Sequence, residues 1–442
     1  ISMGVAAPIV LLALSGLVAL PGWLLHRTLL RRLGLSWRVG IGLVLAAAAV
    51  LFSDVGAVSG YRLGVMLAIN LAVIAGLALW WMAAGRAVPE APPSFEEEDQ
   101  GARLLSVLFH ILLFCVFLTP AFVLYLPFDT DAQGFGYLAL MVREGGAIDT
   151  LAPWQPDVRY LYSPALFVWW AYLSDLLRLP LHQVMLPFSH IMAGLAVWLG
   201  IDLGSALAPD RPRLRWLIPL TMTAGLGLFT TLMDSAYTSV FGLLFVALFL
   251  TLTFHALRDG SPTISVLAAI ALAAIPLTHP DTAIIFLLGY LPFYATFWLS
   301  RFEARGLSPL SQNPARAAWL RLFVIIPALG LALTAPWLAR VWPLFFEEHV
   351  VSPFPLSLTH IRQLVWHNGL LAPLLSLVGA WLALRRRRAA DLLILTWLIF
   401  IIDFSMFGLT ARLFGLAGLD IMRYVYPFSV AWHGPIIPYA YL

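Results

Sequence analysis

The feature that most constrains this sequence is the recurrence of long apolar runs along its whole length. Several runs reach roughly 18 residues or more, enough for a helix to cross the ~30 Å hydrocarbon core of a bilayer. Of the 442 residues, 61% are hydrophobic and 11% are charged, whereas a soluble chain carries about 25% charged residues. The runs are too long and too uniformly apolar for barrel strands. The sequence therefore predicts an all-α, polytopic integral membrane protein that contacts membrane lipid.

We expect about 12–13 transmembrane helices from these runs. The predicted spans are 5–25, 39–58, 64–84, 104–126, 184–206, 216–233, 238–257, 262–278, 280–299, 322–345, 368–384 and 390–410, with a weaker one at 424–442. The first three spans form an N-terminal membrane unit (1–84), a polar cytoplasmic linker follows (85–103), and a larger membrane body completes the sequence (104–442). Because the first residue is Ile1 and not Met, we expect the natural protein to extend beyond the sequence.

Arginine-rich loops give the expected topology, because basic loops stay on the cytoplasmic side. These loops are Arg27–Arg38, Arg86–Arg103, Arg211–Arg215, Arg301–Arg321 and Arg385–Arg388. With all five inside, the apolar stretch 161–180 does not cross the membrane, and 127–183 is a long outer loop. Aromatic residues such as Trp169 and Trp170 then suit an interfacial or re-entrant helix. The alternative is a true crossing, which would move Arg211–Arg215 to the outside.

Two carboxylates at the start of this outer loop are the first candidates for chemistry. Asp129 and Asp131 follow directly on a predicted span. Carboxylates two residues apart at a membrane surface can share a divalent metal, or divide into a base and a metal ligand. A helix with apolar residues on one face is predicted next, over 132–144, and Gly145-Gly146 ends it. The alternative is that both acids merely cap this helix.

The surrounding motif resembles the GT-C superfamily of membrane glycosyltransferases, which use polyprenyl-phosphate sugars. The resemblance consists of the acidic loop, a helix with Tyr137 that ends in Glu144-Gly145-Gly146, and Tyr162-Ser163-Pro164 before an aromatic helix. It covers roughly residues 104–300, and protein mannosyltransferases and aminoarabinose transferases belong to that superfamily. The resemblance implies a GT-C-like body in which Asp129 or Asp131 is catalytic. Two features depart from the pattern: three helices precede the motif helix, and Ser163-Pro164 replaces a Pro-Pro pair.

A second polar break, Thr278-His279-Pro280-Asp281, separates two apolar runs. The expected topology places it on the same outer side as Asp129. His279 and Asp281 can coordinate metal, relay a proton or bind substrate, since ionisable groups at this depth are costly unless used or paired. The alternative is a tight turn in which the histidine caps a helix.

Two further outer segments complete the candidate site. Glu347 and His349 lie in one loop and add potential metal ligands to Asp129 and Asp131, although their spacing matches no standard zinc motif. Arg423 lies near the predicted outer interface, where a guanidinium can grip a lipid phosphate through two parallel hydrogen bonds. The alternatives are an ordinary polar loop and a local ion pair between Arg423 and the acid three residues before it.

We therefore expect transfer of a sugar from a polyprenyl-phosphate donor to an acceptor on the outer face of a bacterial cytoplasmic membrane. Asp129 and Asp131 would be catalytic, Arg423, Tyr162, His279 and Asp281 would bind substrate, and a divalent metal is the one cofactor suggested. Two alternatives stay open: a non-catalytic membrane subunit of a larger complex, and a lipid or sugar transporter. The near-neutral charge balance, +3, gives no reason to expect nucleic acid as a partner.

Overall fold

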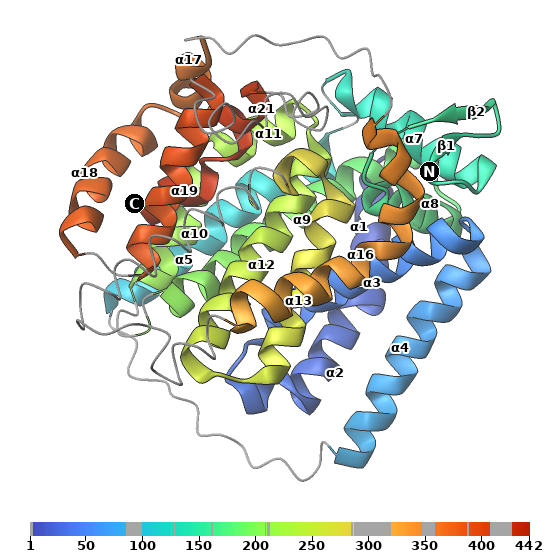
Figure 1. Ribbon diagram of the computed structural model, residues 1–442, viewed down its shortest axis with the longest axis horizontal. Helices are drawn as coiled ribbons and strands as arrows, with labels where there is room; N and C mark the ends of the chain where they lie inside the picture. Colours follow the sequence, from blue (N-terminus) through green and yellow to red (C-terminus); the bar gives the residue numbers. More distant parts are fainter. Residues whose placement is uncertain are drawn as a thin grey trace.

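The protein is a bundle of apolar helices that carries one small hairpin at its edge (Figure 1). The structure, a computed structural model, describes residues 3–442 except 85–99, 125, 128, 161, 208, 210–212, 284–285, 287–319, 347–358, 387–388 and 407–426. Within these residues helices account for nearly all of the regular structure. The predicted all-α class is therefore confirmed, with the hairpin as a local exception.

The N-terminal half of the chain contains the longest helices and the hairpin. Its helices are α1 (Met3–Leu14), α2 (Leu20–Thr28), α3 (Trp37–Ser59), α4 (Leu63–Ala84), α5 (Gln100–Leu113), α6 (Thr119–Val123), α7 (Asp131–Gly145), α8 (Ala165–Leu177) and α9 (Leu181–Leu207). Short helical turns η1 (Ser15–Ala19) and η4 (Phe114–Leu118) join α1 to α2 and α5 to α6, and η2 (Leu30–Leu33) follows α2. The antiparallel hairpin consists of β1 (Thr150–Leu151) and β2 (Gln155–Arg159). Helix α5 begins at Gln100, so the last residues of the predicted linker are helical.

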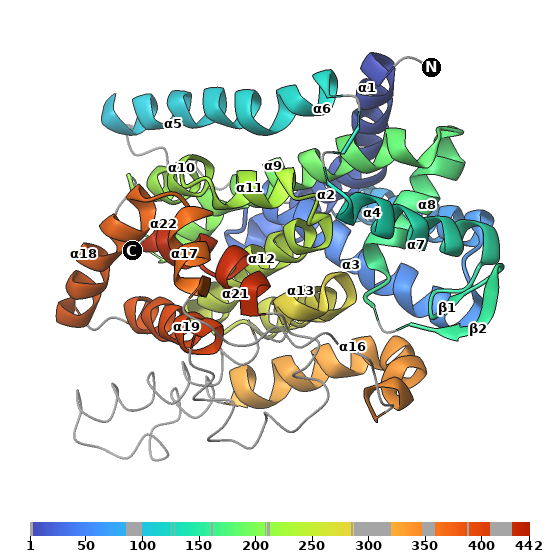
Figure 2. The same cartoon turned by 90° about the horizontal axis from the view of Figure 1, so that it is seen from above.

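The C-terminal half contains α12 and a series of shorter helices. They are α10 (Leu214–Ala224), α11 (Gly227–Met233), α12 (Tyr237–Asp259), α13 (Pro262–Thr278), α16 (Ile326–Val341), α17 (Thr359–Trp366), α18 (Leu371–Arg386), α19 (Ala389–Met406), α21 (Pro427–His433) and α22 (Ile436–Tyr441). The turns η6 (Arg321–Ile325) and η7 (Trp342–Phe346) flank α16. Helices α9, α12 and α13 form the centre, and α3 packs on them from the N-terminal half (Figure 1 and Figure 2).

Six of the described helices are long and apolar enough to cross a membrane, and a seventh candidate is bent. The six are Val5–Thr28, Trp37–Ser59, Leu63–Ala83, Gln100–Val123, Leu181–Leu207 and Tyr237–Ala256. Arg215–Ala224 and Gly227–Met233 make the seventh, with a bend of 42° between them. This is an integral membrane protein, but the described part shows six or seven candidate spans where the sequence predicts about twelve or thirteen. Most of the predicted span 280–299 lies outside the described residues. Where the weaker span 424–442 was predicted, the described residues form two short helices, α21 and α22.

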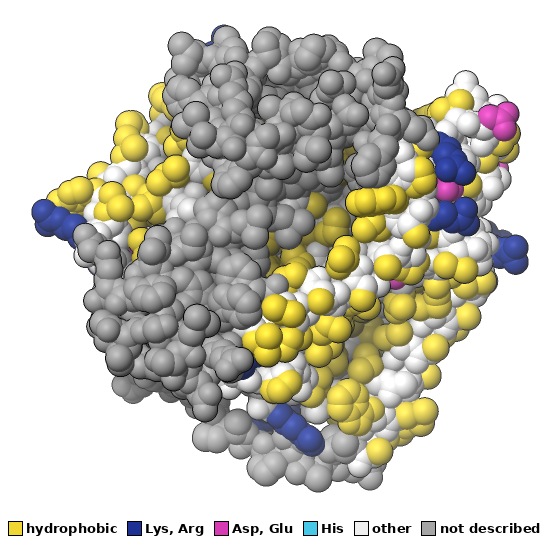
Figure 3. Space-filling model, in the orientation of Figure 1, with side chains coloured by type: hydrophobic (Ala, Val, Ile, Leu, Met, Phe, Trp, Pro, Cys, Tyr) yellow, Lys and Arg dark blue, Asp and Glu magenta, His cyan; other side chains and the backbone are white. Residues whose placement is uncertain are grey.

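The outer surface of the bundle is apolar, as a lipid-facing surface must be. Helix α4 stands apart from the centre in Figure 1, and α18 lies at the opposite flank. Their most exposed apolar residues are Leu71, Leu79, Met82, Leu371, Leu374 and Leu377. In Figure 3 hydrophobic side chains form a broad band over the described surface, and charged side chains lie towards its margins. These faces support contact with membrane lipid.

The stretch predicted to lie at the interface is instead buried in protein. Helix α8 has 13 residues, about 20 Å of helix, which is too short for a ~30 Å hydrocarbon core. Trp169 and Trp170 have no exposed surface and pack against the rings of Phe52, Phe188 and Tyr237. The prediction that these tryptophans sit at the membrane interface is therefore wrong. Composition alone could not distinguish a ring facing lipid from a ring facing other helices.

Polar contacts to distant segments hold both ends of α3. At one end, which we call the loop end, the turn after α3 meets the loop after α7, where the Tyr61 amide donates to the Gly146 carbonyl oxygen over 2.5 Å. The Tyr61 hydroxyl donates to Asp175 over 2.7 Å, and the Arg143 guanidinium donates to the same carboxylate over 2.6 Å. These contacts fix α7 and α8 on the end of α3.

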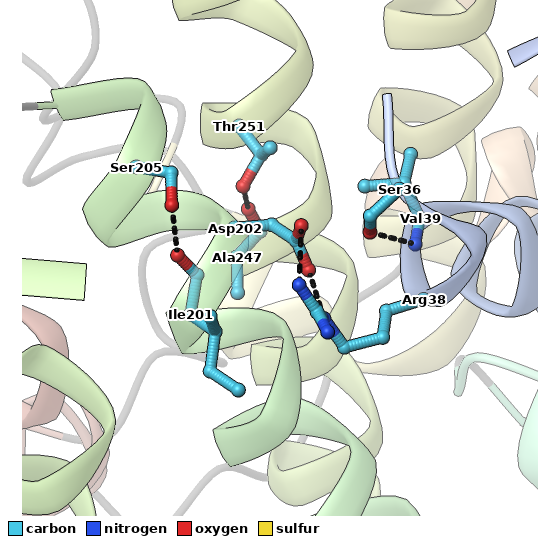
Figure 4. A network of polar contacts seen from close by, with 8 residues as sticks. All are labelled: Ser36, Arg38, Val39, Ile201, Asp202, Ser205, Ala247 and Thr251. Carbon is cyan, nitrogen blue, oxygen red and sulfur yellow. Dashed lines mark hydrogen bonds and ion pairs between the residues drawn. The ribbon is translucent and has the colours of Figure 1, made fainter. Parts of the chain in front are cut away.

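A second polar network closes the other end of α3 (Figure 4). Arg38 grips Asp202 through two hydrogen bonds, Nε to Oδ2 at 2.7 Å and Nη2 to Oδ1 at 3.2 Å. The two side chains are 22% and 10% exposed, so the pair is shielded from most of the solvent. Ser36 caps α3 by accepting from the Val39 amide. This network ties the start of α3 to the end of α9.

Candidate functional site

Helix α7 presents the acidic motif, and its sequence explains where it begins and ends. Val142 is fully buried, and Phe135 and Leu138 pack against the core from the same face of the helix. Gly146 ends the helix with a φ of 71°, a left-handed conformation that glycine adopts without strain. The amphipathic helix and its glycine stop, both predicted from the sequence, are therefore confirmed.

Asp129 is held in place by contacts to its neighbours and to a distant turn. Its Oδ1 accepts from the Thr130 amide at 2.5 Å and from the Thr130 hydroxyl at 3.0 Å. Its own amide donates to the Ser235 hydroxyl over 3.3 Å. Thr130 occupies the cap position of α7 without a side-chain cap bond. The acids therefore do not cap the helix through side-chain hydrogen bonds, the alternative drawn from the sequence, although Asp131 in the first turn interacts favourably with the helix dipole.

Asp234 joins these two acids from another part of the chain. It ends α11, one residue before the Ser235 that contacts Asp129. Burial first, and then the charges of Asp129 and Asp131, together raise the pKa of Asp234 to about 6. Asp131 is exposed, yet partial desolvation and then the charge of Asp129 raise its pKa as well. Three carboxylates thus lie close enough for their charges to act on one another.

No basic side chain in the described part of the chain forms an ion pair with this cluster of Asp129, Asp131 and Asp234. Among the same residues no three His, Cys, Asp or Glu side chains come together in a way that could hold a metal ion. Asp129, Asp131 and Asp234 are therefore not such a group on their own. The other predicted ligands, Glu347 and His349, and the predicted phosphate-binding Arg423 lie outside the described residues.

Tyr162 lies on the buried side of the same region. Its hydroxyl shares a hydrogen bond with the Thr238 hydroxyl at 3.1 Å, and its ring packs against Phe135 of α7. The next residue, Ser163, donates to the Pro276 carbonyl oxygen near the end of α13 over 2.5 Å. The Tyr-Ser-Pro segment therefore joins α7, α12 and α13.

His279 caps a helical turn, as the alternative drawn from the sequence predicted. Its Nδ1 lies 3.1 Å from the Thr282 amide and 2.7 Å from the Thr282 hydroxyl. The Ser239 hydroxyl lies 3.4 Å from both ring nitrogens. His279 and Asp281 are each 6% exposed, so neither reaches the surface that carries the acids. The His279 ring lies 6.4 Å from the ring of Tyr162, and its hydrogen bonds favour a structural role for His279.

A small, mostly apolar cavity lies beside Ser239 and Thr282, the residues that contact His279, and sequence reasoning did not find it. The cavity holds about 20 Å³ of space for water-molecule centres, enough for one water molecule. Its polar lining includes Ser239, Thr282 and His433, and His433 Nδ1 lies 3.0 Å from the Thr231 hydroxyl. These residues come from segments far apart in the sequence and match no spacing motif. The sequence gives a recognisable signal for only one further residue of this region, Asp234, which is an acid in a short turn between two apolar runs.

A scan against protein-family models found no match for this chain, and a search of curated proteins found none either. The likeness to GT-C enzymes therefore rests on the motif residues themselves.

Proposed function

We propose that this membrane protein transfers a sugar from a polyprenyl-phosphate donor to an acceptor hydroxyl on the non-cytoplasmic side of the membrane. The observation that carries the proposal is the cluster of Asp129, Asp131 and Asp234 at the loop end, where an acidic loop meets a turn from another part of the chain. The GT-C-like motif around Asp129 adds the reaction class. The arginine-rich loops, at the other ends of the predicted spans, support the outward orientation of this cluster.

The proposed step needs a base at the acceptor. A carboxylate takes the proton of the acceptor hydroxyl while its oxygen attacks the anomeric carbon. The bond from that carbon to the phosphate oxygen breaks, and the lipid phosphate leaves with the bonding electrons. A base works best when its pKa approaches the operating pH, and partial burial and then the charge of Asp129 raise the pKa of Asp131 in that direction.

The three acids have different surroundings and therefore different roles in this proposal. The Asp131 carboxylate is exposed and accepts no hydrogen bond within the described residues, which suits a base that must reach substrate. Asp129 is oriented by Thr130 and by the turn at Ser235, which suits a group that positions the acceptor or steadies Asp131. Asp234 is partly buried, and in this proposal its negative charge acts on the other two carboxylates.

Sugar transfer by the purified protein in nanodiscs tests the proposal. A radiolabelled polyprenyl-phosphate sugar is the donor, and a membrane glycolipid extract supplies acceptors. We expect Asp131→Asn to lower the rate by about 10²–10⁴-fold, the usual contribution of a general base. Asp157→Asn is the matched control, because Asp157 is an exposed acid of β2 in the same outer loop. Wild-type rates in both Asp131→Asn and Asp129→Asn would refute the catalytic assignment.

A further inference from the structure

The exposed face of α7 next to the acids carries an unusual pair of aromatic side chains. Tyr137 is 43% exposed and Trp154, in the loop between β1 and β2, is 54% exposed. Their rings are nearly parallel, with centroids 6.2 Å apart and 25° between the planes. Large aromatic residues usually bury their surface, so a stacked pair left open is unexpected unless something covers it.

The loop that carries Trp154 is fixed against α7. A Cβ on Gly145 would overlap the carbonyl group of Ala152, so this close approach depends on glycine. The hydrogen bond from the Tyr160 amide to the Asp149 carbonyl oxygen, 3.1 Å, closes the base of the hairpin that carries this loop, and β1 contacts α7. Figure 1 and Figure 2 both show the hairpin beside α7 at the edge of the molecule. The aromatic pair is thus held by backbone packing on both sides.

An open strip connects this pair to the acids. Thr130, Gln133, Gly134 and Tyr137 are spaced three, four and seven residues from the first, so they lie on one face of the helix, and all four are exposed. The strip is about 10 Å long. A Cβ on Gly134 would meet no atom within 4 Å, so the middle of the strip is bare backbone beneath open space. A flat molecule can therefore lie along α7 from the stacked rings to Asp131.

We propose that this strip binds the carbohydrate chain of the acceptor, with sugar rings stacked on Tyr137 and Trp154. This deepens the proposed function and rests on it for the identity of the reaction. The occupant follows from the chemistry of the strip: rings offer flat apolar faces, while Thr130, Gln133 and the carboxylates offer partners for hydroxyl groups. The nearby acids repel the phosphate headgroups of lipids, which disfavours the other ordinary use of exposed Tyr and Trp, as anchors in the membrane interface.

Binding of soluble oligosaccharides tests this without any donor lipid. Maltohexaose, cellohexaose, mannohexaose and arabinohexaose are titrated against the protein in nanodiscs by saturation-transfer NMR. We expect at least one to bind wild type, and Trp154→Ala and Tyr137→Ala each to raise its Kd roughly 2- to 12-fold. Trp366→Ala removes a ring elsewhere that is 66% exposed, and we expect no change in Kd. No binding by the wild type, or an unchanged Kd in both pair variants, overturns the proposal.

Filling the strip is a second, independent test. Gly134→Leu adds a side chain in open space and a better helix former, so we expect equal or higher thermal stability together with weaker glycan binding. Unchanged binding in this stable variant overturns the proposal.

The membrane-anchor alternative has its own measurement. A fluorophore is attached to Trp154→Cys in a Cys115→Ser background, which removes the chain's single native cysteine. Quenching by aqueous iodide supports the proposal, and quenching by nitroxide lipids overturns it.

Different results would refute the catalytic proposal and the binding proposal. If Asp131→Asn transfers sugar normally while Trp154→Ala loses glycan binding, the catalytic proposal fails and the binding strip stands.

Discussion

Asp234 gives the sharpest quantitative prediction. Its carboxylate is partly buried near two other acids, which costs free energy of folding, and one of its oxygens has no hydrogen bond to offset that cost. Its Oδ2 atom is buried and has no hydrogen-bond partner among the described residues. The pKa rises from 3.8 to about 6 in the folded protein. Each tenfold change in proton affinity corresponds to about 1.4 kcal/mol, so the ionised group costs the folded state up to roughly 3 kcal/mol. Because Asp234 keeps some contact with water, we expect about 1–2 kcal/mol.

The pH dependence follows from the direction of this pKa change. Below 3.8 the carboxyl is protonated in both the folded and unfolded states and costs nothing. Between 3.8 and about 6 the unfolded state loses its proton first, so folding stability falls as the pH rises, and the full cost is reached above about 6. Asp234→Asn removes the charge but keeps the shape. It should therefore raise stability at pH 8 and change it little at pH 4.

Intrinsic-fluorescence thermal unfolding in detergent measures this difference. For a chain of this size the expected gain at pH 8 is a few °C, and the gain at pH 4 should be close to zero. Asp157→Asn is the control for loss of one negative charge from the loop 127–183. A lower melting temperature for Asp234→Asn at pH 8, or an equal gain at both pH values, would refute the idea that Asp234 is an uncompensated acid.

Two further predictions concern the ends of the bundle. Asp202→Ala should cost about 3–5 kcal/mol because it leaves Arg38 shielded from solvent without its partner, and the double variant Arg38→Met, Asp202→Leu should recover most of that loss in the same thermal assay. Gly60→Ala should cost about 1–3 kcal/mol, since Gly60 has a φ of 74° and its Cβ would lie 2.8 Å from a carbonyl oxygen; Gly64→Ala, in open space within α4, should be neutral or stabilising.

Features set by local sequence were predictable, and α7 shows why. Its extent follows from the spacing of Phe135, Leu138 and Val142 and from the glycines that stop it. The membrane class follows equally from composition, since apolar runs of this length have few other uses.

Features set by tertiary packing were not predictable from the sequence. Asp129 contacts Ser235 across 106 residues, so the third carboxylate joins the cluster only after folding. Trp169 and Trp170 have the composition of an interfacial helix but are buried, because lipid and packed helices favour the same side chains. The sequence predicted that His279 coordinates metal, relays a proton or binds substrate. Its hydrogen bonds to Thr282 show that it lies where one helical segment ends and another begins.

The two ends of α3 have a consequence for motion. This helix has 23 residues, about 34 Å of rise, so it extends the full depth of a bilayer core. Arg38 ties its first turn to α9, and Tyr61, just beyond its last turn, is tied to α7 and α8. A sliding movement of α3 along its axis would have to break both sets of bonds at once. Helix α3 therefore acts as a spacer of fixed length between the loop end and the Arg38–Asp202 pair.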